Sequence, residues 1–113
     1  MTEIVTGDTV VLTLSLKEPD GTASNVASAS QIRVALIRKD RSALLAGPYT
    51  ASSVAAGAAW STGVVVITIP GADTAAITDL EGDIEVEAII GGTARTWPRV
   101  TRGPVQITKG LIT

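Results

Sequence analysis

The chain of 113 residues lacks several residue types on which protein chemistry commonly depends. It has no cysteine, which excludes a disulfide framework and a thiolate metal site. It has no histidine, so the commonest general base, the commonest metal ligand and the near-neutral proton switch are missing together. It has no phenylalanine, one tyrosine and two tryptophans, so aromatic contacts are few. From this composition we expect neither an enzyme nor a bound cofactor or metal.

Long apolar runs and a strong net charge are also missing. No run of 18 apolar residues occurs, so we expect no membrane-spanning helix and no membrane partner. The opening residues, MTEIVTGDT, lack the charged-then-apolar pattern of a secretory signal, which predicts a product that is not secreted. The net charge of −2 gives no strong field to attract a polyanion, and we expect no nucleic-acid partner.

The charges are unevenly distributed along the chain. Six acidic residues lie between Asp73 and Glu87 with no basic residue among them. Four basic residues follow with no acidic one, namely Arg95, Arg99, Arg102 and Lys109. Two explanations are open. The two segments form neighbouring strands that attract each other, or they form opposed charged faces in an assembly of subunits.

The chain is rich in β-branched residues. Thr, Val and Ile make up 38 of its 113 residues, and these types lose rotamer freedom in helices but pack well in a pleated sheet. Apolar residues make up 45%, which suits one folded domain over residues 1–113. In TVVLTLSLK, Val10 and three leucines alternate with Val11, Thr13 and Ser15, which is the pattern of a half-buried strand.

Similar segments follow, separated by Gly, Pro and Asp turns. They predict about seven short strands, near residues 10–16, 32–37, 43–46, 64–69 and 84–90, in the segment after Gly91-Gly92, and at 105–108. Such a pattern is typical of an all-β, two-sheet sandwich, with a small closed barrel as the rival.

Three segments between these strands carry their own expectations. Gly47-Pro48 is expected to end the third strand, and residues 50–59 to form a loop rather than a helical turn. The segment 64–69 is apolar on both faces, so we expect a central strand. Residues 72–78 are expected to form a short helical turn, with Asp73 as its N-terminal cap.

The position of Trp97 depends on the turn at Gly91-Gly92. A two-residue turn places Val86 opposite Trp97, so the indole lies on the apolar face and Arg95 reaches along that face to its rim. A three-residue loop places Trp97 opposite Glu87, on the solvent face. Gly-Gly favours the two-residue turn, which predicts a buried Trp97.

The other two aromatic residues are Tyr49 and Trp60. Trp60 lies between small residues, in AAGAAWSTG. It is either a hydrophobic lid over one end of the sandwich or an anchor for a partner, because buried aromatic side chains often dominate binding energy. The same two interpretations apply to Tyr49.

Carboxylate clusters give no sign of catalysis or of metal binding. Glu85 and Glu87 share one strand face about 6.6–7 Å apart at the backbone, but that spacing is usual on any solvated strand. Asp79, Glu81 and Asp83 alternate without the twelve-residue pattern of a calcium loop. We therefore predict no catalytic constellation.

Four segments carry a resemblance to a known family. They are GDTVVLTLSLKEPDGT (7–22), IRVALIRKD (32–40), VVVITIPGADTAAI (64–77) and GDIEVEAIIGGTARTWPRVTRGPVQI (82–107). Their order resembles that of small immunoglobulin-like β-sandwich domains in virion proteins of tailed bacteriophages, including the N-terminal domain of baseplate upper proteins. The likeness spans most of the chain and implies an antiparallel immunoglobulin-like sandwich.

The resemblance also implies a function. It implies a non-enzymatic virion protein, made in the host cytoplasm, that acts through repeated contacts with copies of itself and with major capsid or tail proteins. A capsid decoration (cement) or minor capsid protein is the first expectation, and a tail or baseplate component the alternative. A monomeric glycan-binding or adhesion module is a further alternative, which needs an exposed aromatic platform.

Candidate contact residues lie mainly at the two ends of the chain, at residues 2–6 and 106–113. Strand addition at an exposed edge is a plausible way for such ends to bind a partner. The side chains that we expect at interfaces are Thr2, Ile4, Tyr49, Trp60, Arg99, Arg102, Ile107, Lys109 and Leu111.

Overall fold

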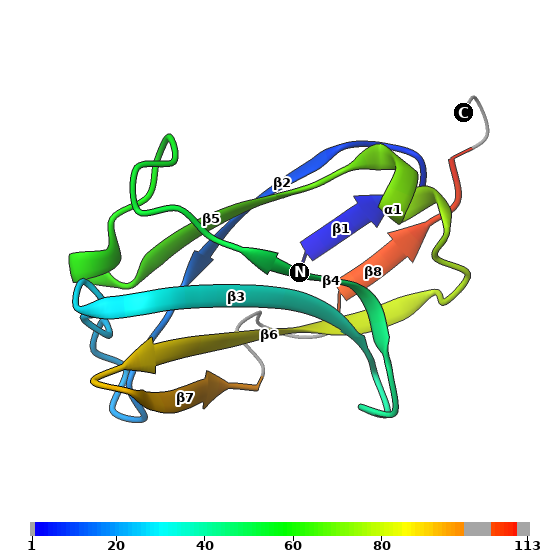
Figure 1. The fold of residues 1–113 in the computed structure, drawn as a ribbon. Helices are drawn as coiled ribbons and strands as arrows, with labels where there is room; N and C mark the ends of the chain where they lie inside the picture. Colours follow the sequence, from blue (N-terminus) through cyan, green and yellow to red (C-terminus); the bar gives the residue numbers. More distant parts are fainter. Residues whose placement is uncertain (1, 99–104, 111–113) are drawn as a thin grey trace.

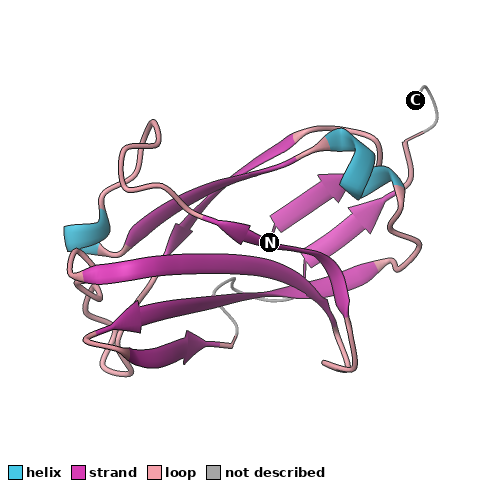
Figure 2. Ribbon diagram, viewed as in Figure 1, coloured by secondary structure: helices cyan, strands magenta, loops and turns pink. Residues whose placement is uncertain are grey.

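The computed structural model describes residues 2–98 and 105–110, and most of its regular structure is β-strand (Figure 2). Two short helical elements, η1 (Trp60–Thr62) and α1 (Gly71–Ala75), lie at opposite ends of the molecule. The described residues form eight strands: β1 (Thr2–Val5), β2 (Val10–Ser15), β3 (Ala29–Arg38), β4 (Leu44–Thr50), β5 (Val64–Ile69), β6 (Glu81–Ile90), β7 (Thr93–Trp97) and β8 (Val105–Thr108).

The strands form two sheets that face each other (Figure 1). The large sheet has the order β1-β8-β6-β3-β4, and β7 pairs with β6 further along that strand. The small sheet consists of β2 and β5. Strands β2 and β5 form one layer, and β3 and β6 pair with each other in the opposite layer. This division of the strands between two layers is that of an immunoglobulin-like sandwich. The prediction of an all-β sandwich is confirmed, and the closed barrel is excluded.

Alternation along the strands builds the core between the sheets. In β2 the leucines point inward, while Val11, Thr13 and Ser15 point to solvent. The facing strands contribute aliphatic side chains in the same way, and burying one such side chain is worth about 1.5–3 kcal/mol. The best buried members are Ile4, Leu16, Val26, Ile32, Val34, Leu36, Val65, Ile69, Ile84, Val86 and Val105.

The ends of the chain pair with each other, which corrects two expectations. First, the sandwich is not wholly antiparallel, because β1 runs parallel to β8 with Ile4 opposite Ile107. Second, the side chains of Ile4 and Ile107 are buried in the core, so the prediction that they contact a partner is wrong. These segments are amphipathic strands, and the chain covers their apolar faces itself.

Two strand predictions are also wrong. The strand β4 does not end at Gly47-Pro48 but continues to Thr50. The Gly47-Pro48 peptide bond is cis, and the pairing of β4 with β3 has register shifts. The strand β5 is not central, since it belongs to the two-stranded sheet. Its outward Val66 is buried because the 51–59 segment lies against it; a methyl group on Gly57 would stand 3.9 Å from the Val66 side chain.

The predicted helical turn at 72–78 is present as α1, but its expected cap is not. Asp73 lies inside α1 and makes no capping bond; the N-terminal cap position is Pro70. Thr74 holds this turn against the β1–β2 connection. Its fully buried hydroxyl accepts from the Gly7 N–H at 3.0 Å and donates to the Asp8 carbonyl at 2.7 Å. One hydroxyl therefore joins segments that are far apart in the sequence.

Replacing Thr74 by valine keeps the shape of the side chain but removes the hydroxyl. We expect the free energy of unfolding to fall by about 1–3 kcal/mol, because a donor and an acceptor lose their partner in a poorly hydrated place. Urea denaturation of Thr74→Val against Thr78→Val, an exposed threonine in the same segment, measures the difference. Equal stability of the two variants would contradict the role given to Thr74.

Candidate functional site: the outer face of the large sheet and its rim

The β6–β7 hairpin has the register that the Gly-Gly turn predicts. Gly91 and Gly92 both have positive φ, 59° and 78°, as a two-residue type I′ turn requires. Val86 is therefore opposite Trp97, and Trp97 is only 7% exposed. The prediction that Trp97 belongs to the core is confirmed.

Arg95 covers Trp97 at the rim of the sandwich. Its guanidinium lies 4.5 Å from the centroid of the indole ring and donates to the Glu18 carboxylate, at 3.1 Å for one of the two bonds. Hydrogen bonding to Arg95 lowers the pKa of Glu18, and the same contact raises the pKa of Arg95. As predicted, the arginine head reaches solvent, and here it closes the rim over the indole.

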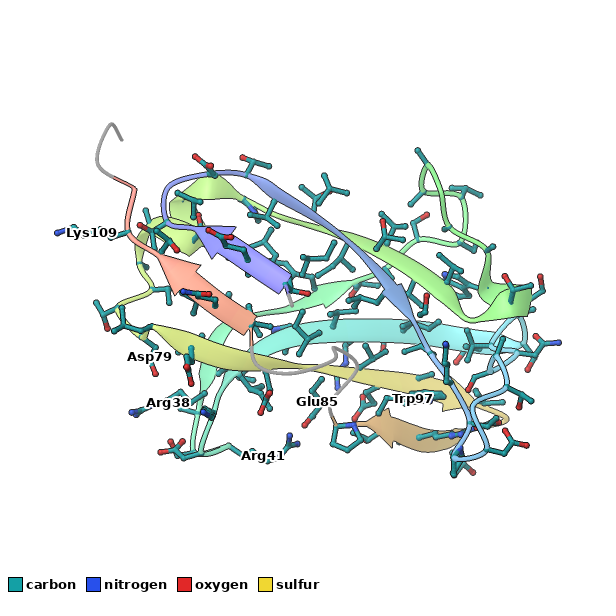
Figure 3. All side chains as sticks on the ribbon, turned by 180° about the vertical axis from the view of Figure 1, so that it is seen from behind. Arg38, Arg41, Asp79, Glu85, Trp97 and Lys109 are labelled. Carbon is teal, nitrogen blue, oxygen red and sulfur yellow. The ribbon has the colours of Figure 1, made fainter. Side chains whose placement is uncertain are left out.

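The outer face of the large sheet carries a row of ion pairs. Arg33 bonds to Glu87 and Lys39 to Glu81, each at 2.7 Å. Hydrogen bonding to Glu81 raises the pKa of Lys39. The row is completed by two more pairs, Arg38–Asp79 and Arg41–Glu85, which Figure 3 shows at the β3–β4 turn and beside β6.

These pairs correct the charge prediction. The acidic segment does attract a neighbouring strand, but its described partners come from β3 and the β3–β4 turn rather than from the basic residues after it. Of those, Arg95 pairs with Glu18, and Arg99 and Arg102 lie outside the described residues. Exposed pairs of this kind each contribute little to stability, typically 0–1 kcal/mol. The chief effect of the row is that the outer surfaces of β3 and β6 carry opposite charges where they adjoin.

A shallow hollow of about 180 Å³ opens between these ion pairs. Ala35 lies in its lining, and Leu44, which is 54% exposed, and Pro48 bring it toward the edge strand β4. Arg33, Glu85 and Glu87 complete the lining with charge already paired on this face. The hollow has an apolar part and a polar border but no free charge among these three residues to select a ligand.

Tyr49 and Trp60 are half-buried and packed against the core. The Tyr49 hydroxyl donates to the Asp73 carboxylate, which joins β4 to α1. Trp60 forms η1 at one end of the sandwich, with its indole nitrogen buried. The lid interpretation of Trp60 fits this position. Together with the buried Trp97, these residues account for all three aromatic side chains, and none offers an open platform.

The remaining predicted contact residues are placed as follows. Thr2 is half-buried on β1, and Lys109 is exposed and extends from the end of β8 (Figure 3). Leu111, like Arg99 and Arg102, falls outside the described residues. For Thr2 and Lys109 a role in contacts stays a prediction.

Four of the carboxylates that the sequence singled out lie in separate ion pairs. Glu85 and Glu87 are separately paired with arginines, and Asp79 and Glu81 with other bases. Within residues 2–98 and 105–110, no cluster of acidic side chains has the arrangement to hold a metal ion. No helix in that part of the chain is long and apolar enough to cross a membrane.

One candidate surface was not predicted from the sequence, namely the unpaired side of β2. This strand pairs with β5 on one side, and no other described strand pairs with it on the opposite side. We call the residues whose backbone faces that side, Val11, Thr13 and Ser15, the β2 edge. The signal was present in VVLTLS, which has neither charge nor proline, but only the sheet order shows which strand lies at an edge.

The tyrosine contact predicts an unusual alkaline titration. Burial and the bond to Asp73 raise the pKa of Tyr49 above its ordinary value of 10.0. Because the pKa of Tyr49 is higher in the folded than in the unfolded chain, the protonated hydroxyl stabilises the folded protein. This stabilisation is complete below pH ~10 and is lost as pH rises beyond it. Tyr49 is the only tyrosine, so tyrosinate absorbance reports it directly. We expect ionisation to be delayed until the protein unfolds, and Asp73→Asn to bring it earlier. A normal titration in the folded protein would contradict this.

Comparisons with known proteins identify no relative: no protein-family model, curated protein or solved structure matches this chain.

Proposed function

We propose that this chain is a non-enzymatic structural protein of a tailed-phage virion, in the first place a capsid decoration (cement) or minor capsid protein. It would be made in the host cytoplasm and would stabilise the particle through contacts with its own copies and with the major capsid protein. One observation carries the proposal. The four segments that resemble phage sandwich domains coincide with β2, β3, β5 with α1, and β6 to β8, in one two-sheet body.

The surfaces of the body are compatible with this role. The described outer face of the large sheet carries a row of ion pairs. Such a charged surface limits non-specific association with other proteins. The ends β1 and β8 are fixed to each other in the sheet, so both lie on a defined surface. Such a rigid body can offer the same contact repeatedly across a symmetric particle.

The two alternatives differ in their support. A tail or baseplate position uses the same body and differs only in the neighbour and the copy number. A monomeric glycan-binding or adhesion module needs an exposed aromatic platform, whereas Trp97 is buried and Tyr49 and Trp60 are packed against the core. The aromatic geometry therefore favours the virion proposal over the adhesion module.

Particles purified from a lysate of the phage that encodes this chain test the proposal. We expect the protein in the particles, at a copy number comparable with that of the major capsid protein for a decoration protein and lower for a minor capsid protein. Particles that lack it should lose their DNA at a lower temperature, and added purified protein should restore them. Immunogold label confined to the tail would select the tail or baseplate alternative. Absence from the particles, with glycan binding by the pure protein, would overturn the proposal.

A further inference from the structure

The free strand edges differ in how they are protected. An unpaired edge is a template for another strand, and proteins usually blunt it with charge, proline, bulges or short length. In the large sheet, β1 has four residues and carries Glu3, and β4 contains Pro48 and two register shifts. The strand β7 carries Arg95 and is followed by Pro98. Each of these edges has at least one such device.

The β2 edge has none of them. The six residues of β2 contain no charge and no proline, and their register with β5 is uninterrupted. Leu16 continues this ladder by donating to the Gly63 carbonyl at 2.8 Å. Since the direction of backbone groups alternates along a strand, those of Val11, Thr13 and Ser15 point away from β5. No hydrogen bond from any described residue reaches them.

We propose that the β2 edge is a self-association site at which two copies of this chain pair their β2 strands antiparallel about a two-fold axis. The two small sheets then become one continuous sheet through both copies. The proposal extends the proposed function, and rests on it only in that a virion protein would meet its own copies at high local concentration.

The residues along the edge suit this pairing. With the axis at Thr13, Thr13 lies opposite its own counterpart and Val11 lies opposite Ser15 of the other copy. Threonine pairs across strands are favourable, and β2 itself has no charged residue that could meet a like charge. The even register also keeps Leu12 and Leu14 on the core side in both copies. Val11 is 63% exposed in the single chain, and the neighbouring strand would cover part of it.

The charges that flank β2 favour a second copy of the chain as the partner, in the antiparallel direction. Asp8 precedes the strand and Lys17 follows it, and both are exposed with no ion pair to any described residue. With the axis at Thr13, Lys17 of one copy lies opposite Thr9 of the other and therefore diagonally next to Asp8, at both ends of the pair. A parallel pair would bring like charges together. Glu18, which falls opposite Asp8 in this register, is already paired with Arg95. A second copy of this chain therefore offers an uncharged strand to the β2 edge and a lysine beside each Asp8.

A charge exchange tests the partner's identity. We expect the wild-type chain to dimerise in sedimentation equilibrium, and Asp8→Lys and Lys17→Asp each to weaken the dimer about tenfold at low salt. Each single variant puts like charges at both ends of its own pair. A mixture of the two variants restores opposite charges at both ends, so it should associate as tightly as wild type. A mixture no tighter than either variant alone would overturn the proposal.

A second pair of variants tests the edge itself. Thr13→Lys places two lysines opposite each other on an exposed position and should abolish the dimer. Thr68→Lys is the matched control, because Thr68 is exposed on the same outer face of the neighbouring strand β5. Circular dichroism should show both variants folded. A dimer that survives Thr13→Lys would overturn the edge assignment but leave the virion role open. A wild-type monomer at millimolar concentration would overturn the assignment, whereas the virion role depends on particle composition.

Discussion

The register between β3 and β6 is the constraint on which the rest of the structure depends. Their pairing runs unbroken from Gln31 opposite Ile89 to Arg38 opposite Gly82. That register places Val34 opposite Val86 in the core and, one residue earlier, Arg33 opposite Glu87 on the outer face. A slip of one residue would exchange the two faces, burying the charges and exposing the aliphatic side chains. Core and surface are therefore specified together.

The two sheets meet solvent in different ways. The large sheet carries charged side chains on its outer face and pairs them across β3 and β6, and its edges are short, charged, bulged or interrupted by proline. The small sheet exposes Val11, Thr13 and Ser15 and has no charge on β2. Because charge protects the first surface and β2 carries none, a strand can pair with the β2 edge at little electrostatic cost.

The connections at the two ends of the sandwich fix the small sheet over the large one. At one end, the Thr74 hydroxyl and the bond from Tyr49 to Asp73 tie α1 to the β1–β2 connection and to β4. At the opposite end, η1 brings Trp60 against the core, and Arg95 closes the rim over Trp97. The polar contacts thus hold the layers in place, while the aliphatic core provides the stabilisation that drives folding.

The sequence by itself determined what neighbouring residues encode. Alternation marked β2, β3 and β6 and their inward faces, and Gly91-Gly92 determined the register that buries Trp97 and carries Arg95 to the rim, because a two-residue turn leaves one pairing. Only the tertiary structure decided which distant segments lie side by side: the parallel pairing of β1 with β8, the basic partners of the glutamates on β6, and the free side of β2. Non-local pairing depends on how whole sheets assemble, and no short segment carries that information.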